Sequence, residues 1–350
     1  MYIDPIYSQL ILPLIISLFL AINMGASGTA PSFSAAFGAN LIPKNLIPGL
    51  FGIMVFAGAV IAGKNVAITL GTGFLPQENM TILLTSIILL SVALSLLMAN
   101  LLGIPQSTSQ STVFALSGAS VYFGNFESNK LFIEIIPTWL ILPFVAFGLA
   151  YIAGKYIYSP HRKTKYFEFE TLKRHSGLQA MVIISSLYVA FSLGANNVAN
   201  ASGPVASMVI NELELGDNEQ NFALIMMLSI LIIAPAFGIG SSLMGTKVMH
   251  RTGKEIVELG PVSATLISLI TASLLLSVSL IRGIPASLVQ LNTGAILAIG
   301  CAKHGCKEIF SKSSVRKFWI IWIIAPLFAF LLSITMIWVA DKMGVLAFTA

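Results

Sequence analysis

Long apolar segments recur along the whole chain and restrict its fold more than any other feature. They lie at about 6–42, 46–70, 79–102, 106–124, 132–158, 177–210, 221–245, 256–281, 285–302 and 316–340. A helix needs about 20 apolar residues to cross the hydrocarbon core of a bilayer. Only 9% of the 350 residues are Asp, Glu, Lys or Arg, which is too few to cover a soluble protein of this size. We therefore expect an all-α polytopic membrane protein.

The polar residue types exclude several functional classes. The net charge is +5, but the basic residues lie in short loops and not along a groove, so we expect no nucleic-acid partner. The only charge before Lys44 is Asp4, so the first segment lacks the basic start of a cleaved signal peptide and should remain. Cys301, His304 and Cys306 offer at most three soft ligands, and we expect free thiols without a bound metal or cofactor. No catalytic motif is recognisable, so we do not expect an enzyme.

Loop charges predict the orientation in the membrane. Thirteen of the nineteen Lys and Arg fall in three loops, 159–176, 246–255 and 303–317, whereas the loop 211–221 carries acidic residues and no basic one. Because positive loops stay in the cytoplasm, we expect these three loops inside and both termini outside. The expected location is the plasma membrane, which is the inner membrane in a bacterium.

Three landmarks of the first half recur in the second half, in the same order. A run of small and polar residues at 23–32 recurs at 192–202, and a Gly-Ile-Pro run at 103–110 recurs at 283–290. Between them, a ladder of glycines recurs at an offset of 182, as Gly58, Gly63 and Gly71 and then Gly240, Gly245 and Gly253. With about five segments in each half, an odd number, the halves must enter from opposite faces. We predict two inverted-topology repeats, 1–158 and 177–350, joined by a basic cytoplasmic linker at 159–176.

The small and polar runs are candidate binding sites. Gly, Pro, Ser and Asn within a membrane segment favour broken helices or re-entrant segments, whose free backbone groups must line a cavity or contact protein. Helices resuming near Pro31 and Asn200, and the helical turn after Pro105, would present N–H groups to an anion. Close helix packing through small residues, or a capping role for the Ser107 run, is the structural alternative.

These runs also carry a family resemblance. Residues 194–200, Gly-Ala-Asn-Asn-Val-Ala-Asn, resemble the repeated Gly-Ala-Asn-Asp-Val-Ala-Asn signature of the inorganic phosphate transporter (PiT) family, and the Gly-Ile-Pro-x-Ser runs resemble its Pro-Val-Ser-Thr-Thr-His signature. The resemblance covers nearly the whole chain and implies oxyanion transport with sodium or protons. It implies that substrate contacts come from Ser27, Gly28, Thr29, Ser107, Thr108, Ser109, Gln110, Asn196, Asn197, Asn200, Ser287 and Gln290.

Departures from the family signatures concern mainly the acids. Ser27, Gly28 and Pro31 stand where the family has Asn, Asp and Asn, and Asn197 replaces the other Asp. The family's Ala-Glu-Leu is also replaced, by Ala-Thr-Leu at 264–266. This pattern most resembles the sulfate permease branch. Sulfate has no proton to donate to a carboxylate, and a nearby carboxylate would repel it, so a neutral site suits sulfate better than phosphate.

Three charged residues near segment ends are candidates for coupling or charge neutralisation. Lys64 could neutralise an anion, although a side chain that reaches the interface is the simpler interpretation. Glu134 and Glu258 could carry a proton, with an interfacial carboxylate as the alternative.

The sequence thus predicts a permease that imports sulfate or a related tetrahedral oxyanion by alternating access. A proton is the expected coupling ion and sodium the less favoured one, because the missing acids are also sodium ligands. The alternatives are a phosphate transporter and, in another class, an anion channel. The lipid bilayer is the expected surrounding, and a homodimer is one candidate assembly.

Overall fold

The computed structural model describes residues 8–102, 106–158, 175–216, 218–245, 249, 260–311 and 313–346, and in these ranges the chain is helical without strands. The elements of the first half are α2 (Ile11–Gly38), η1 (Lys44–Leu46), α3 (Ile47–Ala62), α4 (Lys64–Thr72), η2 (Gln77–Asn79), α5 (Ile82–Leu102), α6 (Thr108–Tyr122), η3 (Lys130–Ile135), α7 (Ile136–Ala153) and η4 (Gly154–Tyr158). Those of the second half are α10 (Ser176–Asn197), α11 (Ala199–Glu212), α12 (Glu219–Gly240), η6 (Ser241–Gly245), α14 (Pro261–Arg282), α15 (Leu288–His304), α16 (Cys306–Ser311) and α17 (Ser313–Lys342).

Among the described residues, eight helical stretches are long and apolar enough to cross a membrane. They match eight of the ten apolar segments, so the protein is a multi-pass membrane protein with an all-α fold. The other two segments contain α6, of 15 residues, and α15, of 17 residues. At 1.5 Å per residue these helices are shorter than a hydrocarbon core of about 30 Å. They are therefore partial crossings.

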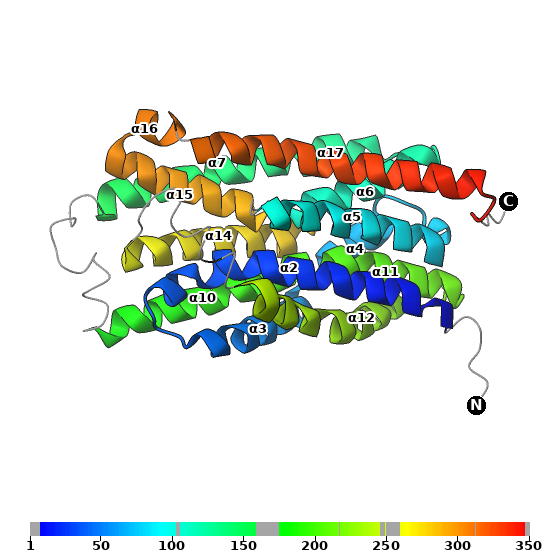
Figure 1. The fold of residues 1–350 in the computed structure, drawn as a ribbon, viewed down its shortest axis with the longest axis horizontal. Coiled ribbons are helices and arrows are strands. Elements are labelled where there is room, and N and C mark those ends of the chain that lie inside the picture. Colours follow the sequence, from blue (N-terminus) through cyan, green and yellow to red (C-terminus); the bar gives the residue numbers. More distant parts are fainter. Residues whose placement is uncertain are drawn as a thin grey trace.

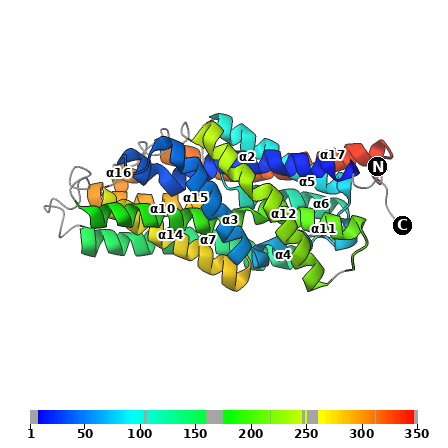
Figure 2. The same cartoon turned by 90° about the horizontal axis from the view of Figure 1, so that it is seen from below.

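The two short helices begin in the middle of the bundle and run to opposite ends (Figure 1). In both cartoon views α5 and α6 occupy the half of the molecule that holds the start of α2 and the end of α17, whereas α14, α15 and α16 occupy the other half (Figure 2). The start of α2 and the end of α17 thus lie at one end of the bundle. This arrangement agrees with termini on a single side of the membrane.

Several extensive helix contacts join the two halves of the chain in matching pairs. Helix α3 packs on α10 and α12 on α2, while α6 packs on α17 and α15 on α7. Because lipid tails are as apolar as the side chains, such contacts depend on close backbone approach through small residues. A Cβ added to Gly194 would lie 2.1 Å from the Val55 carbonyl oxygen, and one added to Gly240 would lie 1.9 Å from that of Ile22. Both crossings therefore require glycine.

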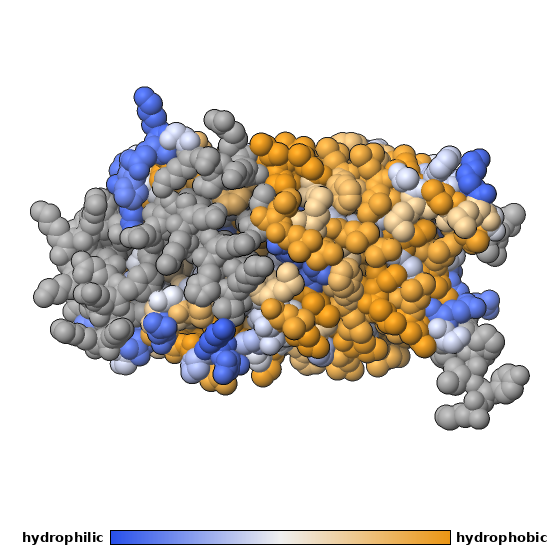
Figure 3. Space-filling model, viewed as in Figure 1, coloured by the Kyte–Doolittle hydropathy of each residue, from blue (hydrophilic) through white to orange (hydrophobic). Residues whose placement is uncertain are grey.

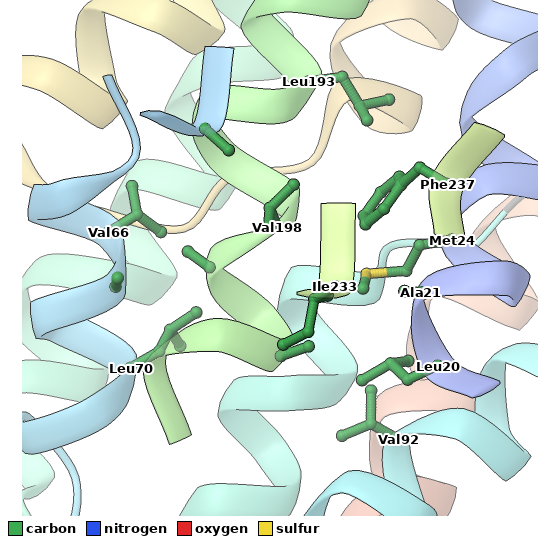
Figure 4. Packing of buried hydrophobic residues seen from close by; sticks show 14 of the residues in the cluster. Leu20, Ala21, Met24, Val66, Leu70, Val92, Leu193, Val198, Ile233 and Phe237 are labelled. Atoms are coloured by element: carbon green, nitrogen blue, oxygen red, sulfur yellow. The ribbon is translucent and has the colours of Figure 1, made fainter. Parts of the chain in front are cut away.

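Large apolar side chains fill the space around these crossings. Figure 4 shows Leu20 and Met24 of α2 together with Ile233 and Phe237 of α12 and Leu193 of α10, all of them buried. The outer surface is apolar as well. On the face in Figure 3, apolar residues cover a broad area, and hydrophilic ones lie mainly toward the two ends of the described part, with a small patch near the middle.

One expected helix break is absent. Helix α2 is continuous from Ile11 to Gly38, although the sequence analysis expects a break at 23–32 and a helix resuming near Pro31. The hydroxyls of this run are compatible with a continuous helix, because Thr29 donates to the Gly25 carbonyl (2.7 Å) and Ser32 to the Gly28 carbonyl (3.0 Å) within it. In the second copy, only Val198 separates α10 from α11, and its backbone is also right-handed helical.

Candidate functional site

A small cavity lies where α2, α10, α6 and α15 meet. Its lining is polar on most sides and comes from Ser27, Gly28, Pro31, Gln106, Ser107, Thr108, Ser109, Leu193, Asn197, Ala286, Ser287, Leu288 and Val289. The cavity volume is about 10 Å³, close to the room that a single water molecule needs. A tetrahedral oxyanion is larger than water, so the lining must widen to admit one.

Two helix N-termini face this cavity. Helix α6 begins at Thr108 and α15 at Leu288, and the first two residues of each helix belong to the lining. The first N–H groups of a helix have no carbonyl partner within it, and each N-terminus carries a partial charge of about +0.5. The cavity therefore receives N–H donors and positive potential from two sides.

Both helices start with the same cap. Ser107 and Ser287 have extended backbones, and their hydroxyls accept from the N–H groups of Gln110 (3.3 Å) and Gln290 (3.2 Å). A serine in this position stabilises the first turn. The cap uses the oxygen of each serine as acceptor, so each hydroxyl keeps a proton that it can donate. Among the described residues, no side chain bonds the hydroxyl of Thr108, which is also in the lining.

The remaining polar lining comes from α2 and α10. Ser27 and Gly28 lie on α2, and Asn197 lies at the end of α10. Ser27 donates to carbonyls of its own helix, at 3.1 Å to Met24 and 3.3 Å to Asn23. Asn197 is partly exposed. Seven of the twelve substrate-binding residues expected from the sequence thus line one cavity.

The other five lie outside the lining. Thr29 faces Gly245 of η6, where an added Cβ would lie 3.0 Å from the Thr29 hydroxyl oxygen, closer than an ordinary contact. Asn200 is buried and donates to the Asn197 carbonyl (3.0 Å) and to Ser109 (3.4 Å), while its Oδ1 has no partner. The remaining three are Asn196, Gln110 and Gln290.

Asn196 is fully buried and joins three elements. Its Oδ1 accepts from the Ser109 hydroxyl (3.1 Å) and from the N–H of Ala286 (3.3 Å). Its Nδ2 donates to the Ser279 hydroxyl of α14 (2.7 Å). One side chain of α10 thus holds the first turn of α6 and the segment before α15 next to each other.

Gln110 and Gln290 form a pair behind the cavity. Each Nε2 donates to the Oε1 of the other residue, at 3.1 Å in both directions. The pair connects the first turns of α6 and α15, so it fixes the separation of the two N-termini.

Gln106 is a lining residue that the sequence analysis misses. Its Nε2 donates to the hydroxyls of Ser95 (3.0 Å) and Ser111, and its Oε1 is buried without a partner. The position between Pro105 and the capping Ser107 is the only signal in the sequence. The apolar lining residues Leu193, Ala286, Leu288 and Val289 carry no signal of their own.

No charged or titratable side chain contributes to the described lining. Lys64 forms an exposed ion pair with Glu219 at 2.6 Å, where α4 and α12 begin. Glu134 is exposed on η3, beside the exposed Phe132 and Ile133. Glu258 lies outside the described residues. Lys64 and Glu134 therefore make no contact with the cavity in this conformation.

Comparison with known proteins identifies the family. The sequence model of the phosphate transporter family matches residues 24–171 and 157–333. A sulfate permease of Bacillus subtilis, CysP, is 34% identical over 317 residues, which are 89% of this chain and 83% of that protein. A putative phosphate permease of Methanocaldococcus jannaschii is 28% identical over 327 residues, 92% of this chain and 94% of that protein.

The fold also has a solved counterpart. The structure of a sodium-dependent phosphate transporter superposes with a TM-score of 0.82 at 22% identity, over 96% of this chain and all of that one. At this identity the likeness concerns the fold alone. Taken with the matches in sequence, it leaves one conclusion: the chain belongs to the phosphate transporter family of membrane transporters, the family that its signature residues resemble.

Proposed function

We propose that this protein is a permease that imports sulfate or a closely related tetrahedral oxyanion by alternating access, with a proton as the coupling ion. The observation that carries the proposal is the cavity between the N-termini of α6 and α15. Its lining provides backbone N–H groups, serine and threonine hydroxyls and amides, which are the groups that bind an anion without a counterion. An enzymatic role has no support in this donor set.

Sulfate fits this set better than phosphate does. At neutral pH phosphate keeps a proton, which needs an acceptor, whereas all four oxygens of sulfate accept. The described lining offers donors from two helix N-termini and contains no carboxylate. An Asp in the position of Asn197 would oppose a dianion and would suit a protonated phosphate. The 34% identity to a sulfate permease supports the same choice, and phosphate remains the second candidate because other relatives are putative phosphate permeases.

Alternating access is supported by the small volume of the cavity and by the paired helices. An oxyanion needs a wider cavity than this conformation provides, so binding and release require α6, α15 or both to move. The matching contacts of α3 with α10 and of α12 with α2 relate the two proposed inverted repeats. In such folds one repeat moves against the other around a central site. In the proposed orientation, which rests on loop charge, the basic loops 159–176, 246–255 and 303–317 face the cytoplasm and both termini face outward.

The preference for a proton over sodium rests on the absence of acids from the described lining, which places any proton-carrying group outside it. Sodium prefers several oxygen ligands, and in the described lining the acids that would supply them are replaced by neutral residues. A channel is the alternative of another class, but an anion channel needs a continuous open path, and the described cavity is about the size of one water molecule.

Purified protein in proteoliposomes tests the proposal. Uptake of radiolabelled sulfate and phosphate is measured with a pH gradient, a sodium gradient or neither. We expect sulfate uptake that is driven by an inward proton gradient, is unaffected by sodium and saturates with substrate. Preferred phosphate uptake would favour the second candidate, and single-channel currents would favour a channel. The variant Thr335→Ala, which changes an exposed residue of α17, is the control for effects of mutation as such.

A further inference from the structure

Trp139 of α7 contacts α6 and also the segment that leads into α15. Its indole N–H donates to the carbonyl of Pro285, two residues before the cap of α15, at 2.7 Å. Its ring stacks on Phe114 of α6, with the ring centroids 6.3 Å apart and the ring planes at 22°. Trp139 is buried, and it is not part of the described cavity lining. An effect of Trp139 on the cavity therefore passes through the elements that it contacts.

The segment before α15, residues 284–286, is held by side chains of two other helices. Asn196 of α10 accepts from the Ala286 N–H at 3.3 Å and donates to the Ile284 carbonyl at 3.5 Å. The proline between these two residues has no N–H, and its carbonyl is the one that Trp139 bonds. The path of the chain into α15 is thus fixed from the α10 side and from the α7 side.

This segment determines where α15 begins. Ser287 follows it directly, lines the cavity and caps the helix, whose first residue is Leu288. A shift of the segment would move the cap and the free N–H groups of the first turn together. Contact with α7 continues farther along α15, because a Cβ added to Gly294 would lie 2.7 Å from the carbonyl oxygen of Pro143, one turn after Trp139.

On α6, the Trp139 ring lies one turn from the glutamine pair. Phe114 follows Gln110 by four residues, so the two side chains share a face of α6. Gln110 bonds Gln290 of α15 at 3.1 Å. Trp139 therefore provides a second connection between α6 and the start of α15, in addition to the glutamine pair.

The separation of α6 and α15 controls how wide the cavity becomes. Its volume of about 10 Å³ must increase before a tetrahedral oxyanion fits. We propose that Trp139 is a positioning residue that limits this separation and thereby sets the size of the oxyanion that the cavity accepts. The site then favours sulfate over a larger tetrahedral oxyanion such as molybdate. This inference rests on the proposed function, because it concerns the same cavity.

Trp139→Phe should change affinity and size selectivity together. The variant loses the indole N–H, so the segment before α15 is held from the α10 side alone. We expect the Kd for sulfate to rise about two- to twelvefold, the range for one hydrogen bond, and the Kd for molybdate to rise less. Binding of both labelled anions to purified protein measures the ratio. Trp338→Phe, the same change at an exposed site of α17, should leave both constants unchanged.

Hydrogen–deuterium exchange tests the positioning without any anion. Peptides that cover 284–292 should exchange faster in Trp139→Phe than in the unmodified protein, whereas peptides of α12 should not change. Phe114→Leu removes the stacked ring and keeps the indole bond. It should shift the ratio of the two Kd values toward molybdate without faster exchange at 284–292. This second variant keeps the test decisive if Trp139→Phe does not fold.

Equal losses of affinity for sulfate and molybdate, or faster exchange in all helices, would show that Trp139 contributes only to packing. An unchanged ratio in both Trp139→Phe and Phe114→Leu would also overturn the inference. Uptake of radiolabelled sulfate by the unmodified protein in proteoliposomes tests the proposed function separately. If that protein binds phosphate and no sulfate, the proposed substrate is wrong, and the exchange at 284–292 still decides whether Trp139 positions α15.

Discussion

Gln110 and Gln290 exchange two side-chain hydrogen bonds of 3.1 Å, although 180 residues separate them in the chain. The same offset relates the capping serines, Ser107 and Ser287. The glutamine pair therefore lies where a two-fold axis between the proposed repeats would pass. It joins two helices that run to opposite ends of the bundle, and it keeps their N-termini at one cavity.

Replacement of one glutamine by Leu should destabilise the protein more than replacement of both. Gln110→Leu leaves the amide of Gln290 buried and unpaired, which costs about 1–3 kcal/mol. The double variant leaves no unpaired amide and should recover part of that loss. Thermal unfolding in detergent of the two single variants and the double variant measures the coupling. Additive effects would show that the two amides do not depend on each other.

The glycine at the crossing of α10 with α3 should not tolerate a methyl group. In Gly194→Ala the new Cβ would lie 2.1 Å from the Val55 carbonyl oxygen, so the helices must separate. We expect a loss of several kcal/mol in stability or a failure to accumulate in the membrane. Gly148→Ala in α7 is the matched control, because no atom lies within 4 Å of its added Cβ. Equal expression and unfolding temperatures of the two variants would contradict the packing argument.

Thr108 and Asn196 should differ in what their loss changes. Thr108→Ala removes a cavity hydroxyl that no described side chain uses, so the apparent affinity for sulfate should fall about tenfold or more while the unfolding temperature changes little. Asn196→Ala removes four hydrogen bonds within the protein and should lower the unfolding temperature as well. Concentration dependence of uptake and thermal unfolding of both variants separate these effects. A large loss of stability in Thr108→Ala would argue against direct contact with the anion.

The sequence was sufficient for the membrane class and for the start of α6 and α15. Apolar length and the serine after Gly-Ile-Pro are local signals, and the structure places both helix caps where these signals occur. The sequence pattern at 23–32 wrongly predicted a helix break. Small polar residues also fit a continuous helix when their hydroxyls bond the preceding turn. The sequence did not show that Asn197 lines the cavity whereas Asn196 bonds neighbouring helices within the protein. Adjacent residues of one helix point in different directions, and only the packing decides which of them reaches the cavity.

The orientation of the chain remains a prediction that labelling can check. Because the start of α2 and the end of α17 lie at one end of the bundle (Figure 1), tags before Met1 and after Ala350 should react on the same side. The basic loops predict that this side is the outer one. If a tag after Ala350 reacts only after the membrane is opened, the C-terminus lies inside and the predicted orientation is wrong.

Asn197 provides the sharpest test of substrate choice. It lines the cavity and stands where the family signature has Asp, so Asn197→Asp adds a negative charge to the site that we propose holds a dianion. Two unit charges about 4 Å apart repel by roughly 4 kcal/mol at an effective dielectric constant near 20. Micromolar binding corresponds to about 8 kcal/mol, so sulfate transport should collapse.

Phosphate should escape part of this penalty, because its remaining proton can hydrogen-bond the new carboxylate, and the carboxylate can take up a proton at low pH. The ratio of sulfate to phosphate uptake should therefore fall, most clearly above neutral pH. Uptake of both labelled anions is measured across pH at matched protein levels, with Asn197→Gln as the neutral control. If Asn197→Asp keeps sulfate uptake at alkaline pH, or lowers both anions equally, residue 197 does not select the substrate. The preference for sulfate would then depend on the remaining lining and on similarity to the sulfate permease.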